Sequence, residues 1–288
     1  MAKGSMKSIK RRIKSVGSTM QITKAMEMVA SSKLRHAKSR AEAARPYFET
    51  LYGLISDIAA ENEDFSTVFT AKREVKNRLF IVIAGDRGLA GGYNSNIIKL
   101  VAAAAAKESV NPPKIIPIGK KAVDYYKKHN FEVVAEYPYF SENVKTSNCA
   151  DIANLAADLF KSGEVDEVRI FYTAFVSALQ QNATELPLLP FEIIKESRPD
   201  KTQNRYTIYD PSPQAVFDRI IPRLILSVIN CACVESFASE QSARRNAMEN
   251  ATDNAEEMID KLSLQYNRAR QEKITNEINE IVGGANAV

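Results

Sequence analysis

The sequence predicts an α/β fold in which long helices at the two ends of the chain pair as an antiparallel coiled coil, with an α/β domain between them. Three observations predict it. An apolar seam with coiled-coil spacing runs through the first segment, short β-branched runs alternate with helical stretches in the middle, and the last segment is almost free of proline and glycine. The expected segments are residues 1–60, 75–200 and 210–288.

The N-terminal segment reads as one long helix. Apolar or small residues recur at alternating steps of four and three from Ile9 to Ile58, and only Thr23 and Glu27 interrupt this seam. A repeat sustained over so many turns is typical of a coiled coil, because it gives the helix one continuous stripe for a partner. Pro46 lies inside the stretch and predicts a bend near Arg45, since proline lacks the N–H and its ring clashes with the preceding turn.

The middle segment is expected to form a parallel or mixed sheet. Apolar, β-branched runs that suit buried strands occur at residues 78–85, 114–119, 131–137 and 167–175. Stretches of helical composition occur at about 93–108, 120–129 and 147–162. Because strands and helices alternate along the chain, an α/β arrangement is expected.

The C-terminal segment is predicted to be a second long helix. "YDPSPQAV" (209–216) contains Asp210, Ser212 and two prolines, which is a helix-start signal. After it only Pro222 and the late glycines from Gly283 interrupt helical composition. Small residues that let a partner helix approach closely follow along its seam: Ala238, Ala243, Ala247, Ala251 and Ala255. The two end helices are therefore expected to pair with each other.

The positive charge is concentrated near the N-terminus, although the net charge is only +4. Between Lys7 and Arg40 the single acid is Glu27, whereas acids outnumber bases between Glu235 and Glu280. Ends of opposite charge can pair with each other. A nucleic-acid-binding coiled coil stays open as an alternative, because Lys and Arg dominate nonspecific affinity for nucleic acid. The basic stretch offers few aromatic side chains for base stacking, which disfavours that alternative.

The cysteines, Cys149, Cys231 and Cys233, contain no CxxC pair, so neither a disulfide framework nor a zinc site is expected. A reducing compartment is the simplest inference. No apolar run reaches the roughly 18 residues that a membrane span requires, and the N-terminus lacks the apolar stretch of a signal peptide. We therefore expect a chain that is not secreted and does not itself cross a bilayer.

The glycine-rich stretch "GDRGLAGGYN" (85–94) is the strongest candidate for chemistry. It follows a predicted strand and precedes a predicted helix, where α/β proteins hold phosphate. It lacks both the GK[ST] ending of a P-loop and the GxGxxG pattern. A tight turn that needs glycine is the competing interpretation, and a stand-alone nucleotide-binding enzyme remains an alternative. His36 and His129 are expected at the surface, and we predict no catalytic residues, metal or cofactor.

Four blocks resemble the γ subunit of F-type ATP synthase in order and spacing: "ITKAMEMVASSKLR" (22–35), "GDRGLAGGYN" (85–94), "SEQSARRNAMENATDNA" (239–255) and "YNRARQEKITNEINEIVGGANAV" (266–288). The resemblance implies a Rossmann-like α/β domain between the coiled-coil helices. It also implies the partners: a hexamer of α and β subunits around the helices, and the ε subunit and the membrane c-ring against the base. A noncatalytic bacterial rotor on the cytoplasmic side of the cell membrane is then expected, without the redox-sensitive insert of the chloroplast version.

The resemblance also assigns candidate contact residues. Those matched to the contact with the α and β subunits are Lys24, Met26, Arg244, Arg270, Gln271, Thr275 and Glu277. Tyr209 and Asp210 match a segment that faces the c-ring or the ε subunit. Each has a competing structural interpretation: a solvated coiled-coil face for the charged residues, seam packing for Met26, and helix-start chemistry for Tyr209 and Asp210.

Overall fold

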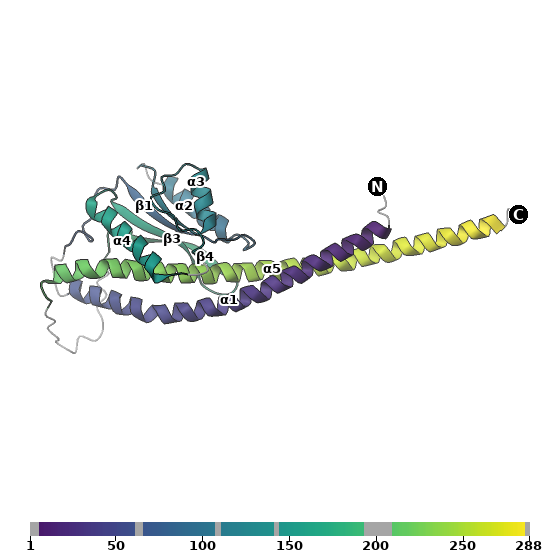
Figure 1. Cartoon of the computed structure of the whole chain (residues 1–288), viewed down its shortest axis with the longest axis horizontal. Coiled ribbons are helices and arrows are strands. Elements are labelled where there is room, and N and C mark those ends of the chain that lie inside the picture. The colour runs from purple at the N-terminus through teal and green to yellow at the C-terminus, as the bar shows by residue number, and fades with distance from the viewer. Residues whose placement is uncertain (1–5, 61–65, 107–110, 141–143, 193–208, 286–288) are drawn as a thin grey trace. The chain divides into compact units, whose positions relative to one another are not determined.

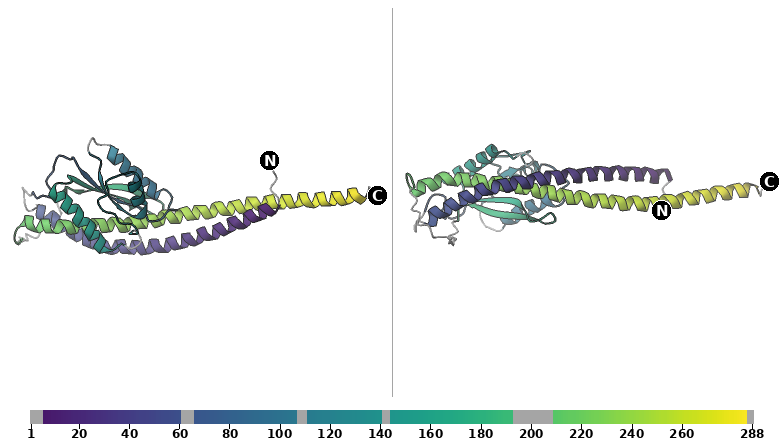
Figure 2. Two further views of the ribbon diagram at one scale, coloured as in Figure 1. Left: turned by 45° about the horizontal axis from the view of Figure 1, so that its top comes forward. Right: turned by 90° about the horizontal axis from the view of Figure 1, so that it is seen from below.

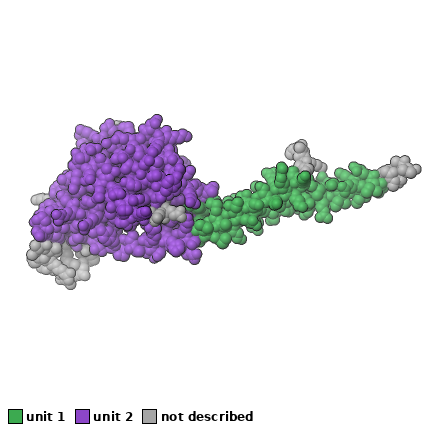
Figure 3. All heavy atoms as spheres, in the orientation of Figure 1, with its two compact units in different colours: residues 1–31, 244–288 green, residues 32–243 purple. Residues whose placement is uncertain are grey.

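A computed structural model describes residues 6–60, 66–106, 111–140, 144–192 and 209–285 of the chain. The chain divides into two compact units (Figure 3). Unit 1 comprises residues 1–31 and 244–288, and unit 2 comprises residues 32–243. The two long helices, α1 (Met6–Ala60) and α5 (Pro213–Ala285), contribute to both units.

Helix α1 has the continuous helical structure that its seam predicts, and Figure 1 draws it as one unbroken ribbon. It continues through Pro46, whose carbonyl accepts a hydrogen bond of 2.8 Å from the Thr50 hydroxyl. A threonine inside a helix commonly makes this bond to the carbonyl four residues earlier. The bend expected near Arg45 stays a prediction.

Unit 2 contains a four-stranded sheet. Its strands are β1 (Arg78–Ile83), β2 (Lys114–Ile118), β3 (Glu167–Phe175) and β4 (Gln181–Leu189), in the order β2-β1-β3-β4. The first three are mutually parallel and β4 is antiparallel to β3. Every residue of the central strand β1 is buried, which explains its continuous apolar run.

Helices α2 (Tyr93–Ala106), α3 (Lys120–Lys128) and α4 (Thr146–Ser162) cover the sheet from opposite faces (Figure 1). Helices α2 and α3 pack with β1 residues Phe80 and Val82 in one core cluster. Helix α4 packs with Leu79, Ile81 and segments of α1 and α5 in the other. The Rossmann-like α/β domain with a mixed sheet, expected for the middle of the chain, is confirmed.

One strand prediction needs correction, and one strand was missed. Residues 131–137 make only isolated parallel bridges beside β2, at Ile115–Val133 and Ile118–Tyr137. Between these bridges residues 133–137 hold one more residue than β2 does, and Pro117 has no N–H to donate, so no continuous ladder forms. Strand β4, which was missed, is polar and contains Pro187. Proline is tolerated there because β4 lies at the edge of the sheet.

Helix α5 begins where the sequence predicts. The Ser212 hydroxyl oxygen accepts a hydrogen bond of 3.2 Å from the Ala215 N–H, one residue before the helix that starts at Pro213. This is the bond that an N-terminal capping serine makes to satisfy an orphan backbone donor. Ser212 of the predicted helix-start signal therefore caps α5.

One stretch of α5 is apolar enough to cross a membrane by length and composition alone, with a mean hydropathy of 1.6 over its best window. This differs from the expectation that no stretch would qualify. Half of that window is buried inside the protein. Buried apolar residues of the helix, including Phe217, Ile221 and Ile229, belong to the core of unit 2. A helix in the core of a folded domain meets the same criterion for this reason.

We predict that Tyr126→Phe leaves unit 2 as stable as before or stabilises it by up to about 1 kcal/mol. Tyr126 lies on α3, is 1% exposed, and its hydroxyl has no hydrogen-bond partner among the described residues. Burial raises the pKa of this hydroxyl far above its usual value. Deleting an unsatisfied polar atom removes a desolvation cost. Urea unfolding measures the effect, and a loss above about 1 kcal/mol would reveal a partner for the hydroxyl.

Candidate functional site

In unit 1 the two chain ends pair as antiparallel helices, as the two views of Figure 2 show. Their contact includes a polar pair: the hydroxyl oxygens of Thr23 and Thr252 lie 2.8 Å apart. Thr23 is only 8% exposed, so the residue that interrupts the apolar seam is nevertheless buried in it. A single polar position in a coiled-coil seam favours the register in which it finds a partner. The predicted antiparallel pairing is confirmed, and Thr23 contributes to its register.

We predict that Thr23→Val and Thr252→Val each destabilise the helix pairing by about 1 kcal/mol, the usual net contribution of one hydrogen bond. A double variant with valine at both positions should have nearly the stability of the wild type, because neither hydroxyl is then left in the seam without a partner. Thermal unfolding of the four-member cycle measures the coupling between them, expected at about 0.5–1 kcal/mol. Strict additivity of the single changes would contradict the contact.

The C-terminal end of α5 in unit 1 presents an apolar stripe. Every residue from Gln271 to Val282 is exposed, and Figure 2 shows this end continuing past the start of α1. Ile274, Ile278 and Ile281 are 43–72% exposed and recur at steps of four and three, which places them on one helix face. A contiguous apolar stripe, unlike a scattered exposed leucine, marks a surface that a partner covers.

A second exposed apolar group lies on the α1 part of unit 1. Ile22, Met28 and Val29 are 54–62% exposed, and they lie in the strongly basic stretch of the sequence. Exposed apolar side chains among Lys and Arg suit an interface with an acidic partner surface, because both burial and charge favour contact.

All seven residues predicted to contact the α and β subunits fall in unit 1. Lys24 is exposed, Met26 is half-buried, and Arg244 is buried at 8% exposure. The remaining four, all exposed on α5, are Arg270, Gln271, Thr275 and Glu277. Glu277 pairs with Lys273 at 3.2 Å, an i,i+4 ion pair of the kind found on a solvated helix face. The roles of these residues stay predictions.

Tyr209 and Asp210 lie in unit 2, directly before α5. Tyr209 is half-buried and packs against the core that contains α4 and α5, whereas Asp210 is exposed. Their proposed contact with the c-ring or the ε subunit also stays a prediction.

The turn 85–94 is braced by its own side chains. The Gly85 N–H donates to the Asn94 side-chain oxygen at 2.8 Å, and the Asn94 amide donates to the Arg87 carbonyl at 3.2 Å. The Asp86 carboxylate accepts hydrogen bonds from the Lys120 N–H at 2.9 Å and the Tyr139 N–H at 2.8 Å. Lys120 is the first residue of α3, so Asp86 supplies the anion that this helix N-terminus would otherwise attract.

In this protein, helix α5 occupies the position where a doubly wound sheet usually binds ligands. Such ligands lie beyond the carboxyl ends of the strands, at the point where the strand order reverses. Here that point lies between β1 and β3, because the chain goes from β1 to β2 on one side of β1 and returns to β3 on the other side. Glu240 of α5 lies against Gly85, where an added Cβ would be 2.9 Å from its carboxylate, and Ser236 and Ser239 of α5 bond Thr173. This geometry favours the structural interpretation of the turn over nucleotide binding.

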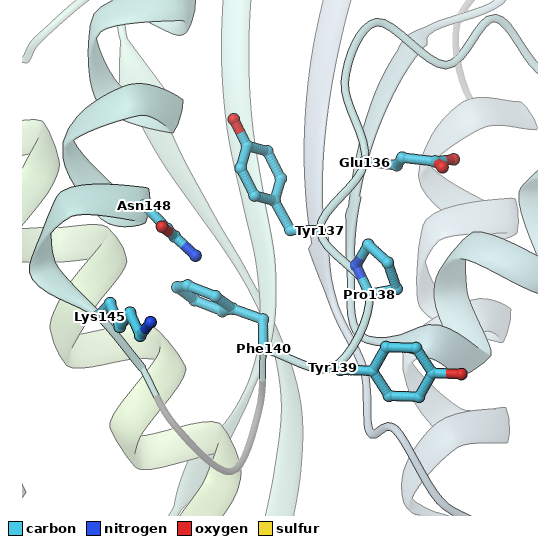
Figure 4. Close-up of a pocket in the computed structure, with 7 residues that line it drawn as sticks. All are labelled: Glu136, Tyr137, Pro138, Tyr139, Phe140, Lys145 and Asn148. Carbon is cyan, nitrogen blue, oxygen red and sulfur yellow. The ribbon is translucent and has the colours of Figure 1, made fainter.

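A cavity of about 330 Å³ opens between residues 136–140 and the start of α4 (Figure 4). Tyr137, Phe140 and Asn148 face it, whereas Figure 4 shows Glu136 and Tyr139 directed away. Burial, and then the charge of Asp151, raises the pKa of Tyr137. Three of the seven lining residues are aromatic, and the others are Glu136, Pro138, Lys145 and Asn148. Because Glu136 is directed away, the lining does not assemble an acid–base pair.

Two of the cysteines contact each other, which spacing along the sequence could not reveal. Cys149 on α4 and Cys233 on α5 are both buried, and a hydrogen bond joins their thiols. That bond, together with burial, raises the pKa of the Cys233 thiol well above its usual value. Cys231 is less buried, so Cys231 and Cys233 have different surroundings. Among the described residues, no three His, Cys, Asp or Glu side chains come together as metal ligands.

These features define a class of protein: a doubly wound α/β domain built onto two long paired helices, with a helix end that offers an apolar surface to partners. A family described as ATP synthase matches residues 5–288. An ATP synthase gamma chain of Ruminococcus albus is 50% identical over 278 residues, which are 96% of each chain. The sodium-ion-specific ATP synthase gamma chain of Acetobacterium woodii is 43% identical, over 97% of each chain. The chain belongs to the ATP synthase gamma-chain family.

Solved structures agree with this fold. A chain of the Euglena gracilis mitochondrial ATP synthase superposes with a TM-score of 0.69 over 98% of this chain and 94% of that one, at 18% identity. A chain from the central stalk and c-ring of the Tetrahymena thermophila enzyme has a TM-score of 0.63 and 25% identity, over 80% of this chain and 99% of that one. The fold class inferred from the sequence is confirmed.

Proposed function

We propose that this chain is the central rotor shaft of a bacterial ATP synthase and is itself noncatalytic. It couples ion flow through the membrane c-ring to the conformational cycle of the catalytic β subunits, which make or hydrolyse ATP. The observation that carries the proposal is the antiparallel pairing of the two chain ends in unit 1, with the Thr23–Thr252 contact in its seam. A paired rod resists twisting and bending, which a shaft requires and a single helix provides poorly.

The proposed partners follow the two units. The α and β subunits surround unit 1 and contact it at Lys24, Met26, Arg244, Arg270, Gln271, Thr275 and Glu277. The ε subunit and the c-ring bind near Tyr209 and Asp210. We propose residues 1–60 and 210–288 as the coiled-coil segments and 75–200 as the α/β base, located at the cytoplasmic side of the cell membrane. We propose no cofactor, no metal ion and no nucleic acid as a ligand of this chain.

A noncatalytic role is supported by the filled ligand position between β1 and β3, where α5 lies against Gly85 and bonds Thr173. Nucleotide chemistry is accordingly assigned to the β subunits. The apolar stripe Ile274–Ile278–Ile281 suits a tip that turns inside a surrounding sleeve. Nonpolar contacts depend weakly on angle, whereas each desolvated ion pair would cost several kcal/mol to break at every step.

The experiment that tests the proposal is reconstitution of the chain with α and β subunits and observation of a marker attached through a cysteine at the exposed residue Ser162. We expect ATP to drive rotation of the marker in one direction, and the chain alone to hydrolyse no ATP. A complex that hydrolyses ATP while the marker stays still would contradict the rotor, as would failure to assemble. Calorimetry of the chain alone with ATP tests the competing enzyme: micromolar binding would favour it.

A further inference from the structure

We infer that Glu235, Ser236, Ser239 and Ser242, on one face of α5, form a hydrogen-bonded joint that fixes the sheet of unit 2 to α5. We name these four residues the β3 clamp. The inference rests on the proposed function in one respect: in a rotor, this joint is where torque passes between the helix and the α/β base. The four residues are positioning residues, since they act by holding β3 and not by touching nucleotide.

The β3 clamp supplies hydrogen-bond partners to the part of β3 that extends beyond its pairing with β1. β1 pairs with β3 from Arg78–Glu167 to Val82–Phe171, and β3 continues to Phe175 without it. Beyond Phe171 the backbone of β3 turns its polar groups to α5. The Thr173 N–H donates to the Ser236 hydroxyl oxygen at 2.9 Å, and the Ser239 hydroxyl donates to the Thr173 carbonyl at 3.0 Å.

The clamp extends to the end of β3 and into the turn that follows it. The Phe175 N–H donates to a Glu235 carboxylate oxygen at 3.0 Å. The Ser242 hydroxyl donates to the Ala178 carbonyl at 2.8 Å, beyond the end of the strand. Residues 235, 239 and 242 follow one another at steps of four and three, so a single helix face makes these contacts.

Burial makes these bonds hard to exchange for water. Ser239 and Ser242 have no exposed surface, Ser236 is 1% exposed and Thr173 is 3% exposed. A buried backbone group that loses its partner costs about 1–3 kcal/mol. Burial raises the pKa of Glu235, and the bond from the Phe175 N–H opposes that shift. The backbone of β3 therefore has a strong preference for this one position of α5.

The other side of the helix face is held by β1. An added Cβ at Gly85 would lie 2.9 Å from the Glu240 side chain, so glycine lets α5 approach the end of β1 closely. Glu240 itself is 3% exposed. Helix α5 therefore contacts both strands where they separate. It packs closely against Gly85 at the end of β1, and it is hydrogen-bonded to β3.

We assign a mechanical role to this contact because hydrogen bonds, unlike apolar contacts, depend on direction. Apolar burial is non-directional and scales with area, so a helix in a purely apolar groove can rotate or slide at small cost. Hydrogen bonds weaken steeply when their distance or angle changes. A row of them inside an apolar core fixes the angle of α5 relative to the sheet, which is what a joint under torque requires.

The test compares a Ser236→Ala/Ser239→Ala double variant with Thr173→Val in the full chain. The Thr173 hydroxyl has no partner among the described residues, so valine removes it and keeps both backbone bonds. We expect the amides of residues 173 and 175 to exchange hydrogen at least tenfold faster in the double variant and at the wild-type rate in Thr173→Val. Glu235→Met should likewise expose the Phe175 amide, and Glu235→Gln should restore its protection, because the amide oxygen can accept the same bond.

The functional comparison uses the same variants in the assembled ATP synthase, reconstituted in vesicles. We expect the double variant and Glu235→Met to hydrolyse ATP within about twofold of wild type while pumping several-fold fewer ions per ATP, since a loosened joint slips under load. Glu235→Gln should recover the pumping ratio. Should the double variant not fold, Ser239→Ala and the two Glu235 variants make the same comparison.

The outcomes separate the joint from the proposed function. Wild-type exchange rates in the double variant would overturn the clamp. Faster exchange with an unchanged pumping ratio would overturn its role in torque. If the wild-type complex hydrolyses ATP without rotating or pumping, the proposed function fails and the torque role fails with it, while faster exchange in the isolated variant still supports the bonds between α5 and β3.

Discussion

Gly119→Ala is expected to prevent unit 2 from reaching its native structure. Gly119 follows β2 with φ of +92°, a conformation that a residue with a Cβ rarely adopts. An added Cβ would lie 2.0 Å from the Ala84 carbonyl oxygen and 2.8 Å from the Ala84 carbonyl carbon. Both atoms belong to backbone at the end of β1 and have no flexible side chain that could move aside.

The expected cost is about 4 kcal/mol or more, which is exceptional for a single substitution and comparable with the total stability of a typical domain. The contact is close because the chain is tied tightly there: the Gly119 N–H donates to the Tyr137 carbonyl, and the Lys121 N–H to the Gly85 carbonyl. Urea unfolding and soluble yield measure the loss.

Two other glycines serve as matched controls for Gly119→Ala. Gly163 has φ of +79° and no neighbour nearer than 4.0 Å, so Gly163→Ala should cost only the backbone strain, about 1 kcal/mol. Gly88 has neither a positive φ nor a neighbour within 4 Å, and Gly88→Ala should be close to neutral. Equal stability of the Gly119 and Gly163 variants would show that β1 and β2 do not approach as closely as described.

The helices could be predicted from the sequence because each carries its signal locally. The seam from Ile9 to Ile58 predicts α1, and Asp210 and Ser212 predict the start of α5 within a few residues. Helices α2, α3 and α4 also fall within a few residues of their expected ranges. Periodicity and capping depend on neighbours within one or two turns, so the sequence alone contains them.

The strands were harder because pairing is non-local. The apolar run 131–137 has the composition of a strand, yet Pro117 and an extra residue limit its pairing to isolated bridges. Strand β4 is polar because it lies at an edge, so it lacks the apolar run that predicts a buried strand. Both errors occur at the borders of the sheet, where composition and pairing are least coupled.

The contacts that matter most for the site were the least visible in the sequence. Thr23 looked like an interruption of the seam, and its partner Thr252 is on the other end of the chain. Ser236, Ser239 and Ser242 carry a signal that the sequence predictions did not use: they are polar residues at steps of three on a helix otherwise rich in small and apolar side chains. Such residues in a buried seam need hydrogen-bond partners, so the pattern indicates a polar contact.

Family resemblance located the candidate contact residues in the chain but not their surroundings. It placed Arg244 with Arg270 as residues facing a partner, whereas Arg244 is 8% exposed and Arg270 is exposed. Burial depends on what packs around a position in three dimensions, and a matched motif carries no such information. Exposure therefore separates the candidates on α5 into one buried residue, at the start of the α5 part of unit 1, and an exposed group toward the C-terminus.

Phe171→Ala is the second large effect we expect, a loss of about 3–5 kcal/mol in the free energy of unfolding of unit 2. Phe171 lies on β3, has no exposed surface, and its ring packs at 4.8 Å between centroids against Phe80 of β1. Truncation removes the buried ring and leaves a cavity between the sheet and α2, which the surrounding strands can fill only in part. Chemical denaturation measures the loss.

Val176→Ala is the matched control, because Val176 follows the same strand but is 56% exposed, and its truncation should change stability by less than about 0.5 kcal/mol. Phe171→Leu should recover most of the loss, since leucine refills much of the volume.

The comparison between Phe171→Ala and its controls bears on how β1 and β3 are held together. Phe171 is the last β3 residue paired with β1, so the apolar core secures the strands up to that point and α5 secures them beyond it. If Phe171→Ala cost less than about 1 kcal/mol, the core on the α2 side would not hold β1 to β3, and the hydrogen bonds from α5 would have to do so alone.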